Sequence, residues 1–167
     1  MIIFLTLVLI ISIITDLRSR KILNIVTIPS ILIGLVYYLF TGGIEGFIYS
    51  GKGFLVGAGL LLIPYLLGGM GAGDVKLMAA IGALMGTGFV LYSFIYTALI
   101  GGVIALFLIL KTRGVKNSIK TVFFQVATFR SNLGEITIQN EKTGSISFPY
   151  GVAIVLGTFT TLIWGGF

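Results

Sequence analysis

The sequence predicts an all-α integral membrane protein, a bundle of six membrane-spanning helices, because it is very hydrophobic and its apolar runs recur at membrane-spanning intervals. Of its 167 residues, 57% are hydrophobic and only 10% are charged, which does not suit a water-soluble domain. No domain boundary appears, so 1–167 is expected to form a single module. Turn residues separate six candidate membrane segments, at about 2–17, 23–40, 47–67, 75–87, 89–110 and 148–165.

The basic residues predict how these segments are oriented. With six crossings and both termini outside the cell, ten of the eleven Lys and Arg residues fall on the cytoplasmic side, and only Lys52 lies near the outer face. Cytoplasmic loops of membrane proteins carry this excess of positive charge. We therefore expect a multi-pass protein of the cytoplasmic (inner) membrane.

The longest polar interval, 111–147, contains a second helical pattern. Between 115 and 133 the apolar residues share one helical face, and Lys116 and Lys120 lie on the polar remainder. This pattern predicts an interfacial amphipathic helix in the last cytoplasmic loop, with its lysines facing anionic lipids. A helix packed against other loops is the alternative.

Composition also limits the chemistry. The chain has no Cys and no His, which excludes disulfides, thiolate catalysis, the usual zinc sites and a histidine base, and we expect neither a metal nor a cofactor. The net charge of +6 comes from short basic clusters between apolar runs, a pattern typical of membrane loops, so nucleic acid is not an expected partner.

Two of the five acidic residues stand out. Glu45, Glu135 and Glu141 lie in polar loops, whereas Asp16 and Asp74 each adjoin an apolar segment at the predicted cytoplasmic boundary. An aspartate inside a membrane helix is costly and is usually functional. The structural alternative is that Asp74 caps a helix starting at Val75 and that Asp16 pairs with Arg20, one turn later.

Paired carboxyl groups can act on a peptide bond. When two carboxyls are too close to ionise together, one keeps a proton and polarises the carbonyl while the other activates water. Gly71 and Gly73, which precede Asp74, allow a tight backbone turn and leave room for an extended substrate. The residues therefore favour Asp16 and Asp74 as an acid and base pair.

Three segments resemble the type IV prepilin peptidases. GAGDVKLMAAIGA (71–83) is similar to the family's GxGD motif, and TDLRSRKILN (15–24) is similar to its other aspartate motif. FPYGVAIVLG (148–157) resembles the Pro-containing entry to the family's last helix. The matches occur in the family's order along nearly the whole chain.

The resemblance implies an aspartyl endopeptidase that removes the basic leader of pilin-like precursors at the cytoplasmic edge of the membrane. It makes Asp16 and Asp74 the catalytic pair and Gly71 and Gly73 the residues that shape the GxGD turn, while Lys76 and Asn24 match motif positions of unassigned role. Many members also carry an amino-terminal region with CxxC motifs that is associated with N-methylation. Its absence predicts a short, peptidase-only form without N-methyltransferase activity.

Two other classes of membrane protein remain open. A presenilin-type protease also uses GxGD, but its partner motif is typically Tyr-Asp, and this chain has Thr15-Asp16. A small ion-coupled transporter or channel subunit could use Asp16 and Asp74 as ion ligands, although transport sites usually lie near the midplane of the membrane. The oligomeric state is not encoded in any residue pattern.

Overall fold

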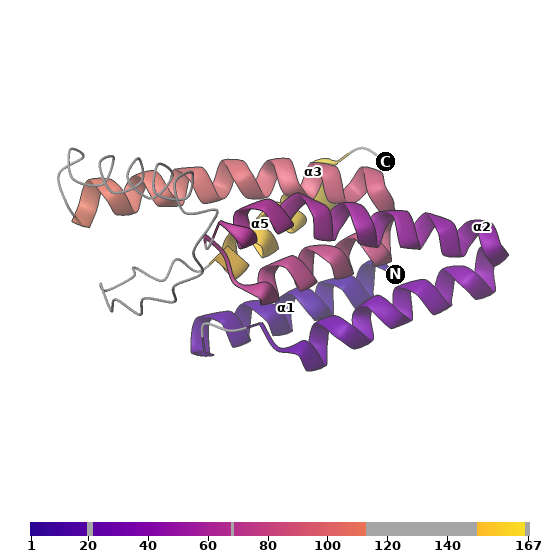
Figure 1. The fold of residues 1–167 in the computed structure, drawn as a ribbon. Coiled ribbons are helices and arrows are strands. Elements are labelled where there is room, and N and C mark those ends of the chain that lie inside the picture. Colours follow the sequence, from indigo (N-terminus) through magenta and orange to yellow (C-terminus); the bar gives the residue numbers. More distant parts are fainter. Residues whose placement is uncertain (20–21, 68, 113–149, 166–167) are drawn as a thin grey trace, which may run out of the picture. The chain divides into compact units, whose positions relative to one another are not determined.

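The computed structural model describes residues 1–19, 22–67, 69–112 and 150–165, and all regular structure in these ranges is helical. The helices are α1 (Ile2–Ser19), α2 (Asn24–Leu66), α3 (Ala72–Thr112) and α5 (Tyr150–Trp164) (Figure 1). The part of α3 up to Gly101 packs with the other three helices as one compact unit. The predicted amphipathic helix, Glu135 and Glu141 lie outside the described residues.

Helices α2 and α3 are each interrupted by one glycine. Gly43 has φ 60° and ψ −143°, and Gly86 has φ 84° and ψ 179°. A positive φ disfavours side chains with a Cβ and breaks the helical hydrogen-bond pattern. Figure 1 shows the chain folding back at both points, and in α2 the rings of Tyr38 and Tyr49 lie 5.1 Å apart across the turn. The break at Gly86 falls near the boundary between the predicted segments 75–87 and 89–110.

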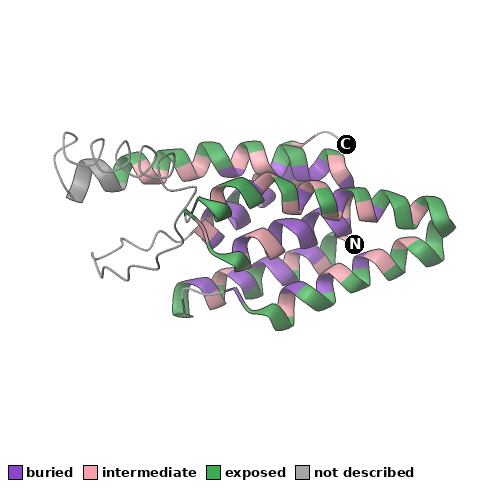
Figure 2. Cartoon of the chain, viewed as in Figure 1, coloured by how far each residue is buried: buried purple, intermediate pink, exposed green. Residues whose placement is uncertain are grey.

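Among the described residues, three helical regions are long and apolar enough to cross a membrane: α1, α2 and the part of α3 up to Phe107. The fourth helix, α5, is apolar but has only 15 residues. Figure 2 shows much of the helical surface as exposed, and many large apolar side chains lie there, such as Ile3, Phe40 and Trp164. Apolar helices with an apolar exterior are typical of membrane proteins. The number of crossings stays a prediction.

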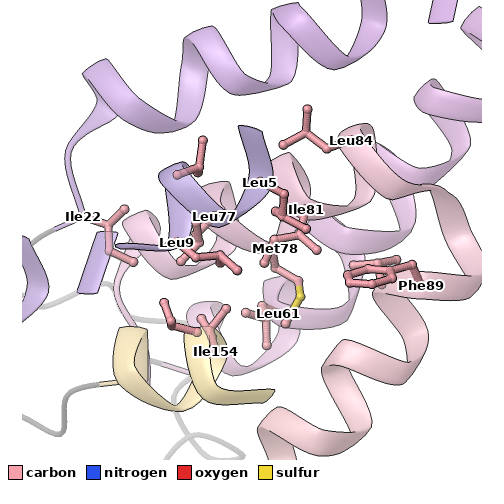
Figure 3. Close-up of a cluster of buried hydrophobic side chains, with 13 residues drawn as sticks. Leu5, Leu9, Ile22, Leu61, Leu77, Met78, Ile81, Leu84, Phe89 and Ile154 are labelled. Carbon is pink, nitrogen blue, oxygen red and sulfur yellow. The ribbon is translucent and has the colours of Figure 1, made fainter. Parts of the chain in front are cut away.

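The core lies between the four helices. Thirteen buried apolar side chains form one cluster, and Figure 3 shows members from α1, α2, α3 and α5 converging. Most of these side chains are fully enclosed, including Leu9, Leu61, Met78 and Ile154. Burying each one stabilises the fold by roughly 1.5–3 kcal/mol in water, and inside a bilayer close packing supplies most of the equivalent gain.

Glycines bring the second half of α2 against the first half of α3. A Cβ on Gly57 would lie 2.9 Å from the carbonyl carbon of Met78 and 3.1 Å from the Cα of Ala79. The hydroxyl of Ser50 also donates a hydrogen bond to the Ala83 carbonyl at 2.7 Å. Small residues and interhelical hydrogen bonds are the usual means by which membrane helices approach closely.

This contact gives two substitutions in the same helix opposite effects. In Gly57→Ala the added methyl group would overlap with backbone atoms of α3, and the substitution should destabilise the protein by about 1–3 kcal/mol. Gly59→Ala points into open space and should be neutral or stabilise by up to about 1 kcal/mol, because alanine favours the helix. Thermal unfolding in detergent measures both changes. An equal effect of the two substitutions would contradict the packing of α2 on α3.

Candidate active site

Asp16 lies on the buried face of α1. The buried residues of this helix include Leu5, Leu9, Ser12 and Asp16, a spacing of three or four that places them along one helical stripe. The side chain of Asp16 is only 6% exposed. Arg20, considered above as its ion-pair partner, lies outside the described residues.

The first turn of α5 packs against the Asp16 carboxyl group. The backbone N–H of Val152 is a hydrogen-bond donor to this carboxyl, while its Oδ2 atom is buried without a hydrogen-bond partner in the described part of the chain. A Cβ on Gly151 would lie 2.5 Å from Oδ2 and 2.8 Å from Cγ. Glycine is therefore the residue that fits between α5 and Asp16.

Asp74 lies in the first turn of α3 and is 8% exposed. Its Oδ2 accepts a hydrogen bond from the N–H of Gly71 at 3.0 Å, and its own N–H donates to the Gly71 carbonyl at 3.1 Å. The expectation that Asp74 caps a helix starting at Val75 is wrong, because α3 begins at Ala72. Asp74 is instead the third residue of α3, and its side chain bonds to the N–H of Gly71, the residue directly before the helix. The acidic residue of a capping box makes the same bond.

The structure brings the two aspartates to the same end of the bundle. The carboxyl end of α1 and the amino ends of α3 and α5 lie together in Figure 1. The charge of Asp16 acts on Asp74, and the charge of Asp74 acts on Tyr150 of α5. Three helices thus contribute to one enclosed acidic site. Within the described ranges, no cluster of three or more His, Cys, Asp or Glu side chains is present.

Gly71 and Gly73 differ in their surroundings, because Gly71 is exposed and Gly73 is partly buried. A Cβ on Gly71 would lie 3.3 Å from Oδ2 of Asp74, and one on Gly73 would lie 3.0 Å from the Cβ of Ile22. The buried Ile22 belongs to the connection between α1 and α2. The space beside Gly73 is therefore filled by this chain's own backbone and side chain, and the two glycines permit close approach around Asp74.

Asn24 and Lys76 contact each other. The Nζ of Lys76 donates a hydrogen bond to Oδ1 of Asn24 at 2.9 Å, at an exposed position. Asn24 begins α2, and Lys76 lies in the first turns of α3, two residues after Asp74. The bond therefore ties the amino ends of these two helices together beside the site. Lys76 does not reach a carboxylate in any ion pair of the described residues.

Sequence reasoning did not include Tyr150 and Gly151 among the site residues. Both lie in the segment FPYGVAIVLG, which carries the resemblance to the family's last helix. The proximity of Gly151 to Asp16 depends on how α5 packs against α1, and a single glycine in an apolar run gives no local sign of such a contact.

Comparison with known proteins identifies the family. The type IV leader peptidase family matches residues 3–106, more than half of the chain. The chain belongs to this family. No curated protein and no solved structure matched it. The resemblance seen in the sequence is thereby confirmed, and membership of the family implies peptidase activity.

The matched range contains both aspartates but not α5. Asp16, Asp74 and the glycines of the GxGD motif all lie within 3–106, whereas Gly151 and Tyr150 lie beyond it. The leader peptidase match and the contacts of α5 are therefore independent observations about the same end of the bundle.

The hydrogen bond between Asn24 and Lys76 should appear as energetic coupling. In a double-mutant cycle of Asn24→Ala and Lys76→Met, we expect a coupling free energy of about 0.5–1 kcal/mol, because the bond is charge-assisted but exposed. Unfolding in detergent measures it. Pairing Asn24→Ala with Lys52→Met, elsewhere on α2, should give additive effects. Additivity in the first cycle would show that the bond does not stabilise the protein.

Proposed function

We propose that the protein is a membrane aspartyl endopeptidase in which Asp16 and Asp74 form the catalytic pair. The observation that carries this proposal is the placement of these two acids, from helices far apart in the sequence, at the same end of the bundle, where each is less than one-tenth exposed and their charges interact. Membership of the type IV leader peptidase family supports the reaction class.

The mechanism follows from the proximity of the two carboxyls. Two neighbouring carboxylates repel each other, so the pair holds one proton between them and titrates as a unit. The ionised group takes a proton from water as the water oxygen attacks the peptide carbonyl, and the protonated group donates to the carbonyl oxygen. The tetrahedral intermediate then breaks its C–N bond, and the leaving amine receives a proton from the pair.

The proposed substrate is the basic leader of a pilin-like precursor, cut on the cytoplasmic side. The exposed Arg18 and the partly buried Lys76 belong to the same helix ends as the aspartates, in agreement with the excess of positive charge in cytoplasmic loops. This orientation places the protein in the inner membrane with both termini outside. A basic leader would gain little from this basic face itself, so anionic lipid and hydrophobic docking hold the substrate.

Two further features of the proposed enzyme are its single activity and its independence of cofactors. We propose that it acts without N-methyltransferase activity and without a cofactor, metal or nucleic acid. The alternative, an ion-coupled transporter with Asp16 and Asp74 as ligands, is not favoured by membership of a peptidase family.

Asparagine substitutions test the catalytic pair. When the protein is co-expressed with a pilin-like precursor, Asp16→Asn and Asp74→Asn should each reduce leader removal by at least about a hundredfold, because general acid and base catalysis typically contributes 10²–10⁴-fold. Glu45→Gln, at an exposed position of α2, should leave cleavage unchanged. Electrophoresis of the precursor and its product measures the rate, and membrane extraction checks insertion. Cleavage that persists in either aspartate variant would reject the pair.

The absence of cysteine allows a direct test of orientation. Single substitutions Arg18→Cys and Glu45→Cys each introduce one thiol at an exposed position. In intact cells a membrane-impermeant maleimide should label Glu45→Cys, and it should label Arg18→Cys only after the membrane is permeabilised. Labelling of both thiols, or of Arg18→Cys alone, in intact cells would contradict a cytoplasmic site.

A further inference from the structure

The first turn of α5 makes two contacts with Asp16 that the family match does not cover. The Val152 N–H bonds to the Asp16 carboxyl, and Gly151 is so close that a Cβ there would lie 2.5 Å from Oδ2. The first four N–H groups of a helix have no partner within it, and they form its positive end. The carboxyl therefore fills a position where a helix terminus stabilises negative charge.

We propose that the first turn of α5 is a third component of the peptidase site, in which Gly151 and the backbone N–H of Val152 hold the Asp16 carboxylate in its reactive position. This inference rests on the proposed function. Gly151 and Val152 are positioning residues, because they contact Asp16 and not the substrate. Glycine at 151 lets the helix end approach closely enough for the N–H of the next residue to reach the carboxyl.

The carboxyl group of Asp16 is only partly satisfied by hydrogen bonds. The Val152 N–H donates a hydrogen bond to the carboxyl, whereas Oδ2 is buried without a hydrogen-bond partner in the described part of the chain. A buried acceptor without a hydrogen bond is costly, so the bond from the Val152 N–H compensates part of the cost of burying this carboxyl.

Proline at position 152 removes the backbone N–H that bonds to Asp16. Because Val152 is the third residue of α5, its N–H has no intrahelical partner to lose, and proline is tolerated in the first turn. The preceding Gly151 has no Cβ to clash with the proline ring. Val152→Pro should lower kcat for a purified pilin-like precursor in detergent by about a hundredfold, the effect of a small displacement of a catalytic group. KM should stay within about twofold.

Val152→Ala separates the side chain from the backbone, because it keeps the N–H. We expect kcat of the proline variant to be at least about tenfold below that of the alanine variant. Equal kcat values for the two variants would overturn the proposal. So would a loss in the proline variant that appears only in KM, since a residue positioning Asp16 acts on the chemical step.

Gly151→Ala provides a second test that does not depend on proline. Its methyl group should displace Asp16 and lower kcat, with KM kept. Gly101→Ala is the matched control, because a Cβ on Gly101 would make an ordinary 3.6 Å contact with Ala153 of the same helix α5, and it should keep full activity. Thermal unfolding of each variant checks the fold. A fully active, folded Gly151→Ala would refute the positioning role.

The outcomes separate this inference from the proposed function. If Asp16→Asn abolishes cleavage while Val152→Pro and Gly151→Ala remain active, the catalytic pair is supported and the positioning role of α5 is rejected. If Asp16→Asn remains active, the proposed function itself is rejected, regardless of the activities of the α5 variants.

Discussion

The enclosure of two like-charged carboxyl groups at the meeting point of three helices is the constraint on which the rest of this structure depends. Removing a carboxylate from water costs several kcal/mol unless hydrogen bonds compensate. Asp16 and Asp74 are each less than one-tenth exposed, and each interacts with a backbone N–H at a helix start. The amino ends of α3 and α5 thus offset part of the cost, and the repulsion that remains favours a pair that holds a proton.

Small residues make this enclosure geometrically possible. Gly57 brings α2 onto α3, Gly73 lets Ile22 pass over the start of α3, and Gly151 lets α5 approach Asp16. At each point a Cβ would lie about 3 Å or less from atoms of another segment. Because a membrane supplies little hydrophobic driving force between helices, such close contacts are a main source of stability. The packing that holds the helices together therefore also brings their ends, which carry the acids, close to one another.

Family membership and geometry contribute different parts of the functional argument. The leader peptidase match assigns the reaction class and covers α1, α2 and nearly all of α3. The contacts of Asp16, Asp74 and Tyr150 add where the proposed catalytic pair lies and what surrounds it. The exposed bond between Lys76 and Asn24 fixes the neighbouring helix ends, which gives these two motif residues a structural place beside the acids.

The sequence by itself determined the helical class, the apolar segments and the two acids, because hydropathy, charge and short motifs are local properties. Asp16 follows the buried stripe of α1, and Asp74 follows a run of glycines, so both were recognisable from their neighbours. Tertiary structure decided that α3 starts at Ala72 and that Lys76 bonds to Asn24. It also decided that Gly151 touches Asp16. These contacts join residues that lie far apart in the chain, and no periodicity or local propensity specifies which helix ends meet.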